Sequence, residues 1–176
     1  MTRIGSRPRT VRLLGLGVAL WAASGCSGSH SSSQSSSPSL TGRYVGTAKT
    51  VLTGRGSSTP VNGGIQFDVA ADKKVTVSDP GQPPYGSGTL NGNSFAVAAP
   101  GSSLNGQGVS CGGAVNFTGT ISGTSMSGDI ASSGLVCNGV PLSLTGTFTA
   151  TLQAELPSGS TGSGFGHRLG ETIRTH

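Results

Sequence analysis

The chain has 176 residues, including 31 Gly and 9 Pro, and its formal net charge is +5. A chain of this length fits one small domain. Four of its eleven Lys and Arg lie within residues 1–25, and the other seven face six Asp and Glu, so the remainder is close to neutral. No basic stripe with interleaved aromatic residues remains after residue 25, which excludes nucleic acid as a partner.

The N-terminus has the pattern of an export signal. An uncharged apolar run over residues 13–23 follows four arginines, Arg3, Arg7, Arg9 and Arg12. The run is far shorter than the ~20 residues with which a helix spans a bilayer. A basic start, a short apolar run and small residues at its end indicate a secretory signal peptide.

The stretch Ala23-Ser24-Gly25-Cys26 ends this signal. It resembles the lipobox of bacterial lipoproteins, in which small residues precede a cysteine that is lipid-modified and becomes the new N-terminus. The resemblance covers only the first 26 residues, and it departs from the family at Ala23, where such signals prefer Leu. It implies that residues 1–25 are the signal peptide and that Cys26 carries the acyl chains, palmitate among them.

The same resemblance implies a cellular location. Ser27, rather than Asp, follows the cysteine, which implies the outer membrane of the bacterial cell envelope, with the membrane as partner through the lipid. Secretion or release into the periplasm by an ordinary signal peptidase is one alternative, and an uncleaved short anchor is another. Nine of the fourteen residues 26–39 are Ser, a composition that cannot bury a core and predicts a flexible tether.

Residues 40–156 form the predicted domain, because apolar and polar residues alternate there with a period of two. In Leu142–Leu152, even positions are apolar or Gly and odd positions are Ser or Thr. This alternation is typical of strands with one buried face. It predicts about eight strands, near residues 42–52, 62–70, 74–79, 85–90, 93–99, 114–122, 125–131 and 141–153.

Short turns separate these strands, which predicts an antiparallel meander. Asn91-Gly92 suits a type I′ turn, Gly123-Thr124 a type II′ turn, and Asp72-Lys73-Lys74 a longer loop. Eight such strands can close into a small up-and-down barrel without exposed edges, and a two-sheet sandwich is the alternative. The outline is similar to avidin and lipocalin barrels, although no sequence motif supports a relationship.

The turn at Gly123-Thr124 fixes a register for the hairpin around it. It pairs Ile121 with Met126 and Phe117 with Ile130, and it leaves Cys111 one residue away from facing Cys137. A bulge at Gly112-Gly113 could absorb that residue. Because export implies an oxidising environment, we expect Cys111 and Cys137 to form a disulfide.

Glycine stands at three inward positions of otherwise apolar strands: Gly119, Gly128 and Gly146. They predict either tight curvature and close sheet contacts or an internal cavity for a small apolar ligand.

No catalytic or metal-binding constellation is predicted, and no cofactor. All three histidines, His30, His167 and His176, lie in the expected tails, so no histidine could activate a serine or ligate a metal in the domain. Asp68 and Asp129 lie on the polar side of their strands, and Asp72 and Asp79 at turns, where we expect solvated carboxylates.

These observations favour a monomeric, non-catalytic envelope protein with a barrel that binds a small apolar or lipid-like ligand. The alternatives are a protein-interaction or inhibitor module and a structural surface lipoprotein. Small lysozyme-inhibitor lipoproteins combine a barrel, an anchor and a disulfide, and Tyr85-Gly86-Ser87-Gly88 is faintly similar to their signature loop. The Gly- and Ser-rich residues 157–176 lack alternation and are predicted to be a disordered tail.

Overall fold

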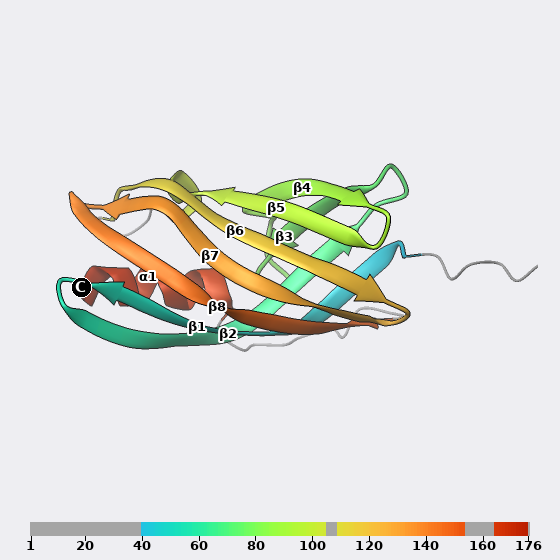
Figure 1. Ribbon diagram of the computed structural model, residues 1–176, viewed down its shortest axis with the longest axis horizontal. Helices are drawn as coiled ribbons and strands as arrows, with labels where there is room; N and C mark the ends of the chain where they lie inside the picture. Colours follow the sequence, from blue (N-terminus) through green and yellow to red (C-terminus); the bar gives the residue numbers. More distant parts are fainter. Residues whose placement is uncertain (1–39, 105–108, 154–163, 176) are drawn as a thin grey trace, which may run out of the picture. The chain divides into compact units, whose positions relative to one another are not determined.

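The computed structural model describes residues 40–104, 109–153 and 164–175 (Figure 1). Eight antiparallel strands form most of it, with one short 3-10 helix, η1 (Gly101–Leu104), and one α-helix, α1 (Phe165–Thr175). The strands are β1 (Gly42–Gly54), β2 (Ser57–Val69), β3 (Lys74–Ser78), β4 (Gly86–Asn91), β5 (Ser94–Pro100), β6 (Cys111–Ser122), β7 (Ser125–Cys137) and β8 (Val140–Gln153).

The strands form a closed barrel in chain order, β1 to β8, and β8 pairs with β1 to complete it. The predicted all-β meander barrel is therefore confirmed, and the sandwich is excluded. Alternate residues point inward and are buried, as in Leu142, Leu144, Phe148 and Ala150 of β8. This alternation follows from the period of two, which puts every second side chain on the same face.

The β6–β7 hairpin has the predicted register. Ile121 faces Met126 and Phe117 faces Ile130, while the ladder shifts by one residue beyond Gly112. The ladder skips Gly113 on β6 but both Gly134 and Leu135 on β7, so the extra residue of the bulge lies on β7 and not at the predicted Gly112-Gly113. Gly113 has a φ of 80°, which glycine adopts without strain. The shift brings Cys111 directly opposite Cys137.

One predicted turn is wrong in its position, and one turn, Asn138-Gly139, was not predicted. Asn91 ends β4 opposite Ser94, so the two-residue turn is Gly92-Asn93 rather than one centred on Asn91-Gly92. Asn138-Gly139 instead has the two positive φ angles, 49° and 78°, that a type I′ turn requires. It directly follows Cys137, at which β7 ends instead of at the predicted residue 131, whereas β8 begins within one residue of its predicted start.

The prediction of a disordered C-terminal tail is wrong for Phe165–Thr175, which form α1. Phe165, Leu169 and Ile173 recur every four residues, lie on one face and are buried. The remaining tail residues, 157–163 and 176, lie outside the described residues. Within the described ranges, no helix has the length and apolar character to cross a membrane.

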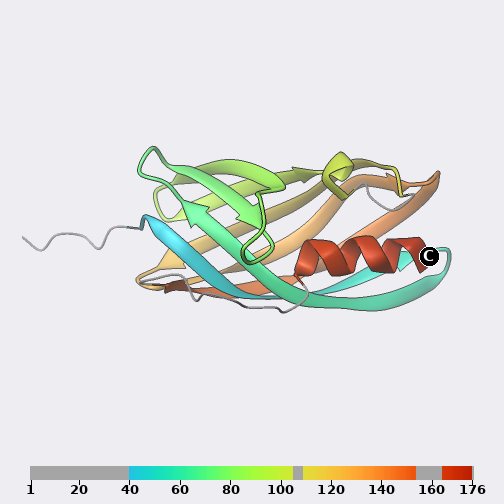
Figure 2. The same ribbon diagram turned by 180° about the vertical axis from the view of Figure 1, so that it is seen from behind.

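Helix α1 lies along β2 and also contacts η1 (Figure 2). Its position follows from the unequal lengths of the strands. β2 has 13 residues, but only Gln66–Val69 pair with the short strand β3. The first part of β2 thus has no strand on that side within the described residues, and α1 covers it. A single parallel bridge, Gly64 to Gly164, joins the two segments.

Candidate functional site

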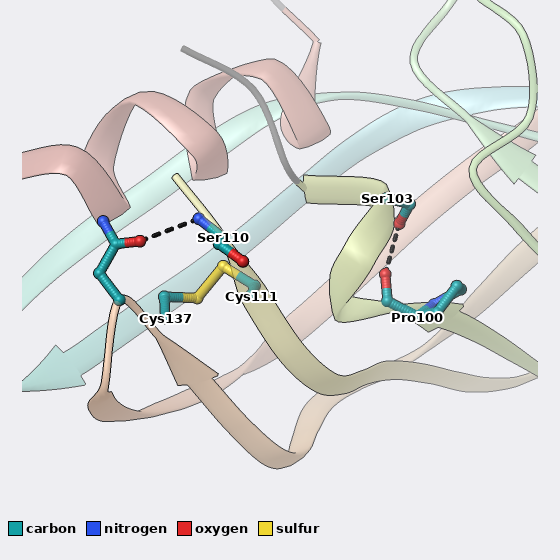
Figure 3. The surroundings of a disulfide bond; sticks show 6 residues. Pro100, Ser103, Ser110, Cys111 and Cys137 are labelled. Carbon is teal, nitrogen blue, oxygen red and sulfur yellow. Dashed lines mark hydrogen bonds between the residues drawn. A yellow bond between two sulfur atoms is a disulfide. The ribbon is translucent and has the colours of Figure 1, made fainter. Parts of the chain in front are cut away.

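The disulfide between Cys111 and Cys137 is present, as predicted, and joins the ends of β6 and β7 (Figure 3). The two Cα atoms lie 4.1 Å apart, and both residues are buried. Next to it, the backbone N–H of Ser110 donates to the side-chain oxygen of Asn138, 2.9 Å away. The disulfide therefore holds β6 and β7 together at the end of the barrel where the Asn138-Gly139 turn begins.

The barrel interior is filled by a cluster of phenylalanine rings. Phe67 is its centre, with ring centroids 5.5 Å from Phe95, 6.0 Å from Phe117 and 4.8 Å from Phe148. All four come from strands and are at most 4% exposed. Phe165 of α1 adds a fifth ring, 6.3 Å from that of Phe117 and nearly perpendicular to it.

The inward glycines make room for this packing. A Cβ atom on Gly119 would lie 2.9 Å from Phe148 Cζ and 3.0 Å from Phe95 Cζ, and one on Gly128 would lie 2.8 Å from Phe148 Cζ. Gly146 faces Thr50 on β1, whose Cα would lie 2.5 Å from an added Cβ. These three glycines therefore permit close contact, and the space in front of them is occupied.

Phe165 enters the interior because β2 carries no side chain at Gly63. A Cβ atom there would lie 2.6 Å from both the N and the Cα atom of Phe165. Gly63 has the inward parity of β2, shared with the buried Val61 and Ile65. The backbone of α1 thus begins where an inward side chain would otherwise lie.

Asp79, which directly follows β3, caps the N-terminus of α1. Its carboxylate accepts the backbone N–H of Gly166 at 2.7 Å and that of His167 at 3.0 Å. These are N–H groups that a helix leaves unpaired in its first turn, and the anion also lies at the positive end of the helix dipole. Only 8% of Asp79 is exposed, so the expectation of a solvated carboxylate is wrong for this residue.

Tyr85 lies beside this cap. Burial, followed by the negative charge of Asp79, raises its pKa well above the usual value of 10.0. Its hydroxyl is buried and makes no hydrogen bond of acceptable geometry within the described residues, although it is near enough to Asp79 to feel its charge. The stretch from Tyr85 to Gly88 leads into β4 rather than forming a long loop.

The other predicted acids lie apart from the α1 cap. Asp68 accepts Arg43 Nε at 2.7 Å and Gln66 Nε2 at 2.8 Å, and Asp129 is exposed. Asp72 is exposed and accepts the backbone N–H of Lys74. Among the residues described, no three His, Cys, Asp or Glu side chains form a group that could hold a metal.

The predicted lipidation site, Cys26, and the tether 26–39 lie outside the described residues. Sequence reasoning missed α1 and its cap. The spacing of Phe165, Leu169 and Ile173 was a usable signal for the helix. The role of Asp79 had no such signal, since 87 residues separate it from the first N–H that it accepts.

No protein-family model matches this sequence, and no curated protein is similar to it.

Proposed function

We propose that this chain is an exported lipoprotein of the bacterial cell envelope, anchored in the outer membrane through Cys26. The barrel is a monomeric, non-catalytic module that binds a small apolar ligand. The anchor is supported by the basic start, the short apolar run and the Ala-Ser-Gly-Cys stretch that ends in Cys26. Acyl chains contribute about 0.8 kcal/mol per buried CH₂, so two or more hold a protein firmly on a membrane.

The ligand proposal depends on one observation. The closed barrel has an interior of apolar side chains that is rich in aromatic rings. Sites for small molecules are mostly apolar, with a few well-placed polar groups. Here Asp79 and Tyr85 are such groups at the edge of the interior. Since the phenylalanine rings of the strands already fill the centre of the barrel, a ligand can enter only where one of the side chains that fill the interior moves away.

Native mass spectrometry of the protein purified from its own host tests this function. The expected result is a complex heavier than the processed chain by one small-molecule mass, which organic solvent removes. A stable complex with another protein would favour the alternative of an interaction or inhibitor module. Repeated recovery of a ligand-free, partner-free barrel would contradict ligand binding.

A further inference from the structure

The interior has one filler that does not belong to the barrel wall. Four rings of the cluster, Phe67, Phe95, Phe117 and Phe148, stand on strands that pair with neighbours on both sides. The fifth, Phe165, belongs to α1, which begins twelve residues after Gln153, the end of β8. We propose that α1 is a releasable plug, and that the space held by its Phe165 ring is the ligand site of the barrel. This inference rests on the function proposed above.

The barrel does not depend on α1 for closure. All eight strands are joined to each other, and the β1–β8 pair completes the ring without any contribution from the helix. Release of α1 would uncover the part of β2 that lacks a neighbouring strand, together with the face of Phe117 that Phe165 now covers. It would leave the ladder itself intact.

Helix α1 is a weak helix by itself. Its attachments include three buried side chains, two hydrogen bonds to Asp79, the bridge at Gly164, contacts with η1 and further polar interactions of two of its exposed residues. It has 11 residues and contains Gly166 and Gly170. A helix of this length is marginal in water even with good helix formers, and glycine is a poor one. Undocking is therefore coupled to unfolding of the segment, which is the kind of local opening that proteins undergo most readily.

The residues that α1 would uncover define the ligand class. Phe117 and Gly63 offer an apolar space that now holds one benzyl group. At its edge, the Asp79 carboxylate would lose the two N–H groups that it now accepts. The freed carboxylate could then accept a hydrogen bond from a ligand that carries an N–H or O–H group. We infer an apolar, ring-bearing molecule with an N–H or O–H donor.

The probe N-phenyl-1-naphthylamine fits this description, because it has apolar rings, one N–H donor and fluorescence that rises in apolar surroundings. The experiment uses full-length protein carrying Cys26→Ala, so that neither acyl chains nor detergent compete for the probe. The loosening variant is Leu169→Ala, which removes a buried side chain of α1 and leaves Asp79 and Phe117 unchanged. The matched control is Glu171→Ala on the exposed face of the same helix, which removes only a solvent-exposed contact with His167 and no buried side chain.

The apparent dissociation constant falls as the open fraction rises. Leu169→Ala should therefore bind the probe at least tenfold more tightly than the parent, because truncating a buried Leu weakens docking by more than that factor. Glu171→Ala should bind like the parent. By reciprocity, saturating probe should speed tryptic cleavage after the exposed Arg168 in the parent.

Equal affinity in all three proteins, or probe binding without faster cleavage at Arg168, would overturn the plug while leaving the ligand function standing. Absence of probe binding even in Leu169→Ala would also overturn the site. The native mass measurement then decides the function separately. If Leu169→Ala fails to fold, the full-length variant Ile173→Ala, which truncates another buried side chain of α1, takes its place with the same expected tightening.

Discussion

At the scale of single residues, the atoms opposite the inward glycines leave no room for a side chain at these positions. A Cβ atom at Gly119 would lie 2.5 Å from Ser127 O as well as close to two phenyl rings. Gly119→Ala should therefore destabilise the barrel by about 1–3 kcal/mol, the usual range for overpacking a core. Gly112→Ala on the same strand is the control, since a Cβ atom there meets nothing within 4 Å. Urea unfolding of both variants gives the comparison, and equal stability would contradict the packing described here.

The disulfide is the second feature at this scale. It closes a loop with a sequence separation of 26, which corresponds to about 3–4 kcal/mol in the chain-entropy model. Cys111→Ser and Cys137→Ser should each lose about that much, because either change removes the same bond. Wild-type protein with reductant should match them in denaturant unfolding. Free labelling of both thiols in unfolded, unreduced protein would refute the bond.

Tyr85 makes the stability of the fold depend on pH in the alkaline range. An unfolded tyrosine ionises near pH 10, whereas burial and Asp79 raise the pKa of Tyr85 well above that value in the folded state. Burial also raises the pKa of Tyr44. The folded state thus holds protons that the unfolded state releases. Stability from this source is complete below pH 10 and falls as the pH rises from 10 towards the folded pKa.

The variant Tyr85→Phe isolates this contribution. Its stability at pH 7 should be close to that of the parent, because the hydroxyl that it removes lies beside Asp79 and makes no hydrogen bond of good geometry within the described residues. It should also lose less stability above pH 10, by up to about 1.4 kcal/mol per pH unit. Denaturant unfolding at pH 7 and above pH 10 measures both effects. Parallel losses in the two proteins would contradict the assignment.

At the scale of elements, the docking of α1 depends on the absence of a side chain at Gly63. Gly63→Ala places a Cβ atom against the Phe165 backbone and should undock α1, so that trypsin cleaves after Arg168 many times faster. The neighbouring Gly64→Ala is the control, because its Cβ atom meets the Pro80 side chain at 3.1 Å and Gly46 O at 4.0 Å, and no atom of α1. Equal cleavage rates in the two variants would show that α1 does not enter at this position.

At the scale of the whole molecule, the fold could be predicted because its signals are local. Alternation revealed the strands, and the turn at Gly123-Thr124 fixed a register that reached as far as Cys111 and Cys137. The unpredicted features are contacts between distant segments. Asp79 meets α1 across most of the chain, and no periodicity in the sequence reports such a contact. The end of β7 differs from its prediction for another reason, because the prediction did not include the local turn signal of Asn138-Gly139.

The same limit applies to the candidate site. The inward glycines were recognised, but two explanations remained open until the rings opposite Gly119 and Gly128 could be seen. A sequence indicates where a side chain is missing and does not indicate which side chain takes its place. Phe165 could not be predicted as such a side chain, because it comes from a segment whose Gly- and Ser-rich composition is typical of a disordered tail.

The most direct test of the central claim is the intact mass of the mature protein, purified from the membrane fraction of its host. We expect a chain that begins at Cys26, heavier than residues 26–176 by the acyl modification and lighter by two hydrogens for the Cys111–Cys137 disulfide. The Cys26→Ala variant should lack the acyl mass and leave the membrane fraction. A wild-type mass that still includes residues 1–25, or a Cys26→Ala variant that stays in the membrane with unchanged processing, would contradict the account.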